Sequence, residues 1–259
     1  MKKPLALLPL LVALVYAAAD HFQTPAAPAA ANPVPSGPQV ATRFADCPQL
    51  FYRNTPPAIA ASLQHARVRE LCFDDFAVLH DGNSRTPLFA AEKLSARSLA
   101  DADEKRTDRF YEEARLRSSE RATLADYRGS GYDRGHMAAA AQRTTPAAMA
   151  QSFSLANMVP QVPENNRGVW ARAVEAATRK YVQRARGEVY VFTGPYFDPQ
   201  QAPRYAGKVR VPDALYKLVY DPAAGKSWVY WAANADVAKP QMLAYDELVR
   251  RTGIRFLPQ

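Results

Sequence analysis

The spacing of apolar residues along the chain alternates between a helical period and a strand period. Apolar residues that recur about every 3.6 positions are typical of a helix with one buried face. This spacing predicts helices over residues 57–70, 147–153, 170–186 and 244–251. Gly253 lies just beyond the last of these segments, where a glycine commonly ends a helix.

Short apolar runs predict β-strands where they are rich in β-branched and aromatic residues and end at turn residues. Such runs cover residues 76–80, 87–92, 189–193, 214–220 and 228–233. Turn-forming clusters follow the first strand at 81–83 and separate the last two at 222–225. Strands that meet at tight turns, with few helices between them, favour an α+β domain with a central antiparallel sheet and flanking helices.

The first residues of the chain have the pattern of an export signal. Lys2 and Lys3 precede a short apolar run over 4–16, and small residues follow at 17–19. The run is too short for a comfortable membrane span, although an anchor that is never cleaved is the alternative. Cleavage would remove residues 1–19 and leave a periplasmic or secreted protein with no stable insertion in a membrane.

The remaining residues divide into a linker and a domain. Residues 20–42 are rich in alanine and proline and nearly uncharged, which is typical of a semi-extended linker. Residues 43–259 then form one domain, which is large enough to bury a sizeable core.

The net charge of the chain indicates which kinds of molecule it could bind. The chain of 259 residues has a formal net charge of +8, and removal of the two lysines in its first 19 residues leaves +6. A basic protein attracts polyanions, so nucleic acid and anionic membrane surfaces are both candidates. Charge alone does not exclude a soluble protein that binds neither.

Cys47 and Cys72 are the two cysteines of the chain. In an exported protein an even number of cysteines predicts a disulfide, with two buried thiols as the alternative. Two cysteines cannot build a zinc site by themselves, and no CxxC or HExxH motif occurs.

The segment 127–137 (YRGSGYDRGHM) concentrates residues suited to chemistry. Its glycines permit tight turns and the close approach of a phosphate. Arg134 can neutralise a phosphodiester while His136 moves a proton, although a single histidine is more often structural. Further along, Asn166 either caps a helix or supplies an oxygen ligand to a magnesium ion that keeps most of its waters.

Three longer segments make the chain resemble the DNA/RNA non-specific endonuclease family. They are DYRGSGYDRGHMAAAAQR at 126–143, SFSLANMVPQVPENNRGVW at 152–170 and VYVFTGPYF at 189–197. The order DRGH, NMVPQ, NNRG is specific to that family, and the similarity runs from about residue 70 to residue 258. The resemblance implies a ββα-metal (His-Me finger) active site within the α+β fold.

The resemblance also assigns a role to each matching residue. His136 matches the general base, and Arg134 matches the arginine that contacts phosphate. Asn157 matches an asparagine that supports the site by hydrogen bonding. Asn166, thirty positions after His136, matches the ligand of a single Mg²⁺, for which Mn²⁺ is an alternative.

Two assignments are less direct. Arg106 resembles the family's upstream arginine that steadies the transition state, but Arg109 competes for the same place. The family usually places a glutamate eight residues after the metal-binding asparagine, where this chain has Val174 and then Glu175. One extra residue rotates a side chain by about 100° around an α-helix. Either the helix begins with a wider turn that restores Glu175 to the metal site, or this contact is altered.

Together these features predict an exported endonuclease that uses water and Mg²⁺ to hydrolyse DNA and RNA, leaving 5′-phosphate ends. A histidine with its usual pKa near 6.5 would make activity rise toward neutral and alkaline pH. The main alternative is a catalytically inactive nucleic-acid-binding module of the same fold. A second alternative is a toxin or effector nuclease paired with an inhibitor protein, and the sequence leaves a homodimer open.

Overall fold

The computed structural model describes residues 37–258 of the chain. The export signal expected at residues 1–19 and most of the linker expected at 20–42 lie outside the described residues. The last residues of that linker segment form strand β1 (Gln39–Ala41), which pairs with β2 (Ala58–Ala60). The folded part of the chain therefore begins earlier than the predicted domain boundary.

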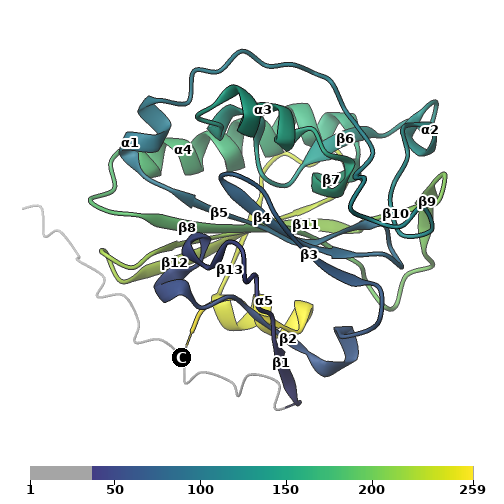
Figure 1. The fold of residues 1–259 in the computed structure, drawn as a ribbon, viewed down its shortest axis with the longest axis horizontal. Coiled ribbons are helices and arrows are strands. Elements are labelled where there is room, and N and C mark those ends of the chain that lie inside the picture. The colour runs from purple at the N-terminus through teal and green to yellow at the C-terminus, as the bar shows by residue number, and fades with distance from the viewer. Residues whose placement is uncertain (1–36, 259) are drawn as a thin grey trace, which may run out of the picture. The chain divides into compact units, whose positions relative to one another are not determined.

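A seven-stranded antiparallel sheet forms the centre of the described chain (Figure 1). Its strand order is β13-β12-β11-β8-β5-β4-β3, and neighbouring strands run antiparallel throughout. The strands are β3 (Val68–Cys72), β4 (Phe76–Asp81), β5 (Thr86–Leu94), β8 (Val189–Tyr196), β11 (Ala214–Asp221), β12 (Lys226–Ala233) and β13 (Gln241–Leu243). The predicted strands all lie within this sheet, which confirms the α+β fold with a central antiparallel sheet.

Both faces of the sheet are buried, as the side chains of β4 show. Phe76 and Val78 pack in one apolar cluster, whereas Ala77 and Leu79 pack in another. Successive side chains of a strand point to opposite faces, so the two clusters lie on the two sides of the sheet. A strand covered on both sides appears in the sequence as a continuous apolar run, which is the pattern at residues 76–80.

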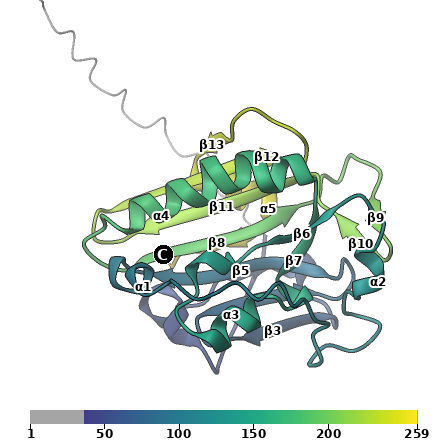
Figure 2. The same ribbon diagram turned by 90° about the horizontal axis from the view of Figure 1, so that it is seen from above.

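Helices cover the two faces of the sheet. Figure 2 shows α4 lying along the face that also carries α1 and α3, and Figure 1 shows α5 on the opposite face. The α-helices are α1 (Ala96–Ala100), α2 (Leu124–Tyr127), α3 (Pro146–Ser152), α4 (Ala176–Val182) and α5 (Tyr245–Thr252). The short 3-10 helices are η1 (Pro48–Leu50), η2 (Tyr52–Asn54), η3 (Ala61–Leu63), η4 (Ala140–Gln142) and η5 (Leu155–Asn157), and a π-helix, η6 (Asn165–Glu175), runs directly into α4. None of the helices in residues 37–258 is long and apolar enough to cross a membrane.

Three of the four predicted helices are confirmed. They correspond to α3, to the part of η6 after the break at Gly168 together with α4, and to α5. The sequence also predicted where α5 ends. Gly253 adopts a φ of 68° and its N–H donates to the carbonyl of Val249 at 2.8 Å, which is the left-handed turn that glycine allows at low cost.

The helix predicted over 57–70 is wrong. The segment instead forms β2, η3 and the start of β3, and β2 lies between β1 and β14 (Ile254–Arg255) in a three-stranded sheet. Its apparent helical period comes largely from alanines, which bury little area. The strand pairings place Ile59 opposite Val40 and Ile254 and bury its side chain completely, so tertiary contacts override the local preference.

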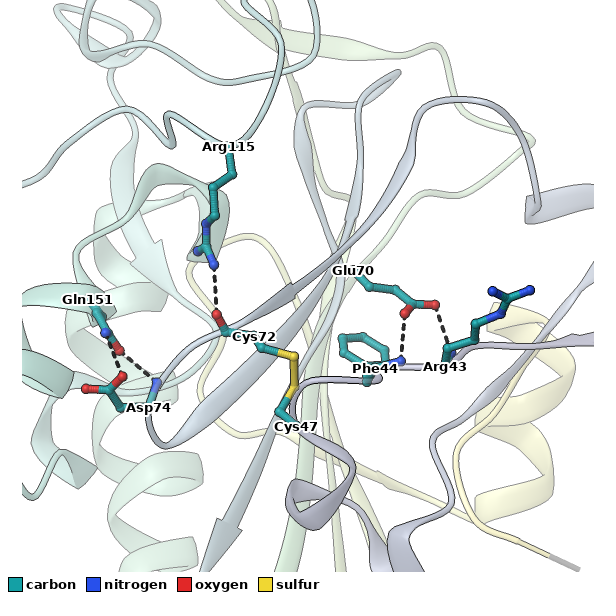
Figure 3. The surroundings of a disulfide bond; sticks show 8 residues. All are labelled: Arg43, Phe44, Cys47, Glu70, Cys72, Asp74, Arg115 and Gln151. Carbon is teal, nitrogen blue, oxygen red and sulfur yellow. Dashed lines mark hydrogen bonds between the residues drawn. A yellow bond between two sulfur atoms is a disulfide. The ribbon is translucent and has the colours of Figure 1, made fainter.

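Cys47 and Cys72 form the predicted disulfide (Figure 3). The bond ties the segment after β1 to the edge strand β3. Glu70 of the same strand reinforces the contact, because its carboxylate accepts from the backbone N–H groups of Arg43 at 2.9 Å and Phe44 at 2.6 Å. The N-terminal segment is thereby held over the apolar cluster that Phe44 enters.

Candidate active site

A cleft of about 370 Å³ brings together most of the residues that the sequence singles out. It lies between a two-stranded hairpin, the helix η6 and the irregular segment before Phe110. The hairpin consists of β6 (Asp133–His136) and β7 (Met158–Gln161). The polar and aromatic residues that line the cleft are Arg106, Phe110, Asp133, Arg134, His136, Asn166, Arg167 and Glu175. Asn157 and Arg109 are not part of this lining.

His136 ends β6, opposite Met158, and its ring is packed between aromatic side chains. The ring centroids of Phe153 and Phe110 lie 5.0 and 5.8 Å from that of the imidazole. The side chain is only 8% exposed, and its Nε2 has no hydrogen-bond partner among residues 37–258. Because Nε2 is shielded from solvent, a water bound in the cleft that the ring lines could give up a proton only to the other ring nitrogen, Nδ1.

The pKa of His136 is lowered to about 3, mainly by burial and then by the positive charges of Arg106, Arg143 and Arg134. The imidazole is therefore neutral across the physiological range, as a general base must be. The expectation of a rise in activity around the ordinary histidine pKa is not supported by this environment. Arg143, which the sequence analysis did not single out, contributes from a fully buried position, where it pairs with Asp75 and Glu92.

Asn157 acts on the backbone next to His136 and does not contact the cleft. It is fully buried, its Oδ1 accepts from the N–H of Ala138 at 2.8 Å, and its Nδ2 donates to the carbonyls of Ala138 and Ser152, each at 2.9 Å. Ala138 follows His136 by two residues. Asn157 therefore holds the chain that leaves β6 in place.

Asn166 lines the cleft with its amide oriented by Asp133. The Nδ2 of Asn166 donates to Oδ2 of Asp133 at 2.9 Å, and Nε of Arg167 donates to the same oxygen at 2.8 Å. This contact occupies the amide nitrogen and leaves Oδ1 available as an oxygen donor. No side-chain capping hydrogen bond occurs at the start of η6, so the alternative role of Asn166 as a helix cap is not observed.

The π-helix explains the displaced glutamate. The backbone N–H that follows η6, on Ala176, donates to the carbonyl of Ala171, five residues earlier. The helix is also interrupted at Gly168, whose φ of −94° and ψ of −109° are not helical, so regular α-helical spacing does not relate Asn166 to Glu175. Asn166 and Glu175 are nine positions apart and line the same cleft. The helix therefore departs from α-helical geometry before Glu175, and Glu175 lines the cleft together with Asn166.

The chemistry of the available ligands suits a hard cation. Residues 37–258 contain no group of three or more His, Cys, Asp and Glu side chains arranged to hold a metal. One amide oxygen from Asn166 and one carboxylate from Glu175 remain, and an ion that keeps several waters needs no more. Burial raises the pKa of Glu175 more than the charges of Lys217, Arg179 and Arg106 lower it, so a cation would favour its ionised form.

Two arginines at the cleft are braced by aromatic rings. The guanidinium carbon of Arg134 lies 4.0 Å from the ring centroid of Phe110, and that of Arg106 lies 5.0 Å from the centroid of Phe153. Arg106 also donates to Asp108 at 2.6 Å. Of the two arginines that compete in the sequence, Arg106 is therefore the one that reaches the cleft.

Sequence reasoning missed the link from Asp133 to Asn166 and Arg167. Asp133 belongs to the DRGH segment, but its partners lie more than thirty residues away and meet it only because β6 pairs with β7. An acidic residue directly before the arginine that is expected to contact phosphate was the available signal, since such a charge requires a partner of its own.

The chain is similar in sequence to known nucleases. The sequence profile of DNA/RNA non-specific endonucleases matches residues 57–259. The mitochondrial endonuclease G of Homo sapiens is 33% identical over 204 residues, which cover 71% of this chain and 68% of that protein. A nuclease of Nostoc sp. is 34% identical over 203 residues, which cover 71% of each chain.

A solved structure shares the fold. It is the crystal structure of an EndoG/EndoGI complex, described as showing the mechanism of EndoG inhibition. The superposition has a TM-score of 0.67 at 26% sequence identity and covers 83% of this chain and 91% of the other.

Proposed function

Because this chain belongs to the DNA/RNA non-specific endonuclease family, we propose that it hydrolyses phosphodiester bonds in both DNA and RNA, with His136 as general base and Mg²⁺ as cofactor. The observation that carries this proposal is the convergence of a neutral histidine, an oriented amide oxygen, the carboxylate of Glu175 and two braced arginines on a single cleft. Each of these groups matches a need of phosphodiester hydrolysis.

His136 would remove a proton from the attacking water. Its low pKa keeps the imidazole unprotonated, and its enclosed position between Phe110 and Phe153 limits its motion. A base with a low pKa takes up a proton less readily, so negative charge must gather nearby during the reaction. The phosphate of the substrate brings this charge when it enters the cleft.

Arg134 and Arg106 would stabilise the negative charge that builds on the phosphate oxygens. Stacking on Phe110 and Phe153 restricts their motion, so they do not need to reorganise during the reaction. Arg134 follows Asp133 and precedes His136 by two residues, which places charge neutralisation and proton transfer on one short strand.

Asn166 and Glu175 would hold the cation, with Asp133 as a positioning residue for the amide of Asn166. When bound, Mg²⁺ supplies Lewis-acid neutralisation of the phosphate and of the leaving 3′-oxygen. With water as nucleophile, the ribose 2′-hydroxyl has no part in the reaction. DNA and RNA would then both be cut, leaving 5′-phosphate ends.

Export is part of the proposal. The Cys47–Cys72 disulfide supports an oxidising compartment, which is consistent with a periplasmic or secreted protein. Some relatives are described as mitochondrial. An inhibitor protein is a candidate partner, because the similar solved structure is an inhibited complex. A homodimer is a further candidate assembly.

The competing function is an inactive nucleic-acid-binding module. Phosphate binding requires arginines but neither a partnerless, neutral histidine nor an oriented amide oxygen beside a carboxylate. These features favour catalysis.

Purified protein incubated with supercoiled plasmid and with RNA tests the proposal. We expect both to be degraded with Mg²⁺ or Mn²⁺, to survive with chelator, and to yield ends that a 5′-phosphate-dependent exonuclease accepts. Tight binding without cutting under every metal condition would favour the inactive module instead.

A further inference from the structure

A second cavity of about 380 Å³ adjoins the active-site cleft. Asp133 and Arg134 line both spaces, so the two share a wall. We call the second cavity the tyrosine pocket; its lining is Leu124, Tyr127, Arg128, Tyr132, Asp133 and Arg134. Tyr127, Arg128 and Tyr132 of the YRGSGY segment thus line a cavity for which the proposed hydrolysis gives no role.

The loop between the two tyrosines is rigidly built. Gly129 and Gly131 have φ values of 65° and 80°, which residues with side chains rarely adopt. Between them, the hydroxyl of Ser130 donates to the carbonyl of Tyr127 at 2.9 Å and accepts from the N–H of Tyr132 at 3.2 Å. Ser130 therefore ties the two tyrosines together, and the pocket exists before any ligand arrives.

The helix on the other side of the pocket is fixed as well. The N-cap of α2, Thr123, exchanges hydrogen bonds with Asp126, whose carboxylate accepts from the N–H and the hydroxyl of Thr123 at 2.8 Å. The other oxygen of Asp126 accepts from the backbone N–H of Lys208 at 2.8 Å. That residue lies between β9 (Arg204–Ala206) and β10 (Val209–Val211), a hairpin drawn beside α2 in Figure 1.

The lining selects for a flat, uncharged group attached to an anionic chain. Tyr132 is half-buried, and Leu124 exposes 37% of its surface although it is apolar. Arg128 is exposed at the mouth and Arg134 stands at the shared wall. The single carboxylate, on Asp133, is already paired with Asn166 and Arg167. Aromatic rings flanked by arginines stack nucleobases while the cations pair with the neighbouring phosphates.

We propose that the tyrosine pocket binds one unpaired nucleobase next to the phosphate held in the cleft, with the base stacked on Tyr132. The inference deepens the proposed nuclease function and rests on it for the position of the phosphate. Arg134 links the two events, because it contacts the phosphate from the wall that the base also touches. Stacking does not depend on which base is present, so the pocket adds affinity without sequence preference.

The test measures binding in chelator, so that no cutting is needed. The probe is an octanucleotide whose positions are all abasic except for one 2-aminopurine, and the reference is the fully abasic octanucleotide. For the unmodified protein we expect the single base to increase affinity by about 5- to 150-fold, the usual contribution of one stacked base. The 2-aminopurine fluorescence should fall on binding.

Three variants locate the effect. Tyr132→Ala should bind both probes with equal affinity, whereas Tyr132→Phe, which keeps the ring, should retain the preference for the base. Tyr205→Ala is the matched control, because Tyr205 exposes 56% of its surface and lines neither space. Unchanged affinity for the fully abasic probe shows that Tyr132→Ala is folded and that its phosphate contacts are intact.

Equal affinity of the unmodified protein for both probes would overturn the proposal, and so would a full preference for the base in Tyr132→Ala. The result is separable from the nuclease proposal. A protein that prefers the base-containing probe but cuts nothing with Mg²⁺ loses the proposed activity and keeps the pocket. A protein that cuts with Mg²⁺ but shows no such preference keeps the activity and loses the pocket.

Discussion

At the scale of single residues, the environment of His136 decides its protonation. Burial and three arginines lower the pKa of the imidazole to about 3. In the unfolded chain the same group titrates near 6.5. Between these values the unfolded state binds the extra proton, so His136 makes the folded state less stable as pH falls below about 6.5.

We therefore predict that His136 does not titrate near pH 6.5 in the free protein. The measurement is the chemical shift of the His136 ring proton, followed by NMR on acidification in the absence of metal and nucleic acid. The shift should stay at its neutral value through pH 6.5 and down to about pH 5. A titration midpoint near pH 6.5 would contradict the assigned environment, as would an acid loss of stability that His136→Ala leaves unchanged.

Asn157 and Asn166 have the same side chain but different tasks, and their alanine variants should separate them. Asn157→Ala leaves buried backbone groups of Ala138 without partners, so it should lower the free energy of unfolding by at least about 1–3 kcal/mol. Asn166→Ala should melt near the wild-type temperature but lose most turnover, with partial recovery at high Mg²⁺. Thermal melting and cleavage rates check both. Equal losses of stability in the two variants would contradict this division.

The residues of the site were visible in the sequence to different degrees. Residue type made His136, Arg134 and Asn166 candidates, and the resemblance to the endonuclease family assigned their roles. The tie between Asp133 and Asn166 was not visible, because it depends on the pairing of β6 with β7.

At the scale of elements, the helix η6 accommodates the one extra residue between Asn166 and Glu175. Its π-helical hydrogen bonding and the non-helical backbone at Gly168 replace the α-helical spacing that would have turned Glu175 away from the cleft. The sequence showed that the glutamate lies nine rather than eight residues after Asn166, and that a wider helical turn would be needed to restore its position. It could not show that the condition is met, because the π-helix is stabilised by packing of Trp170 and Val174 in the core.

We predict that deletion of Ala173 is tolerated, because it removes the extra residue and lets an α-helical turn present the glutamate eight positions after Asn166. Cleavage should stay within about tenfold of wild type, whereas Glu175→Ala should lose about 10- to 100-fold. Deletion of Ala177 from the regular helix α4 is the matched control. It should rotate the rest of α4 by about 100° and lower the melting temperature. Equal damage from both deletions would argue against the role given to η6.

The predicted and observed elements differ for a physical reason. Strands such as β4 and β8 were predictable because burial on both faces leaves an apolar run in the sequence. The segment at 57–70 was not, because its strands are set by partners at Val40 and Ile254, which are distant along the chain.

At the scale of the whole molecule, the disulfide holds the segment that follows β1 against strand β3 of the central sheet. Cys47 and Cys72 are separated by 25 positions, so their bond should stabilise the protein by about 2–4 kcal/mol, mainly through the unfolded state. The bond lies on the edge strand β3, away from the residues that line the cleft.

Reduction should therefore lower stability and leave catalysis intact. We expect the double variant Cys47→Ser, Cys72→Ser to unfold at lower denaturant concentration but to cut at the wild-type rate below its melting temperature. Non-reducing mass spectrometry should find the unmodified chain two hydrogens lighter than its reduced form. Two free thiols in freshly purified protein, or a slower reaction of the folded variant, would contradict this expectation.

The proposed function depends on His136 as the base of a metal-dependent phosphodiester hydrolysis. The most direct test is the single-turnover cleavage rate of His136→Ala, with melting temperature and nucleic-acid affinity measured alongside. The rate should fall by about 10²–10⁴-fold at nearly unchanged affinity. Added imidazole should restore part of the rate in His136→Ala but not in Asn166→Ala. A folded His136→Ala protein that cuts DNA at nearly the wild-type rate would show that His136 is not the base.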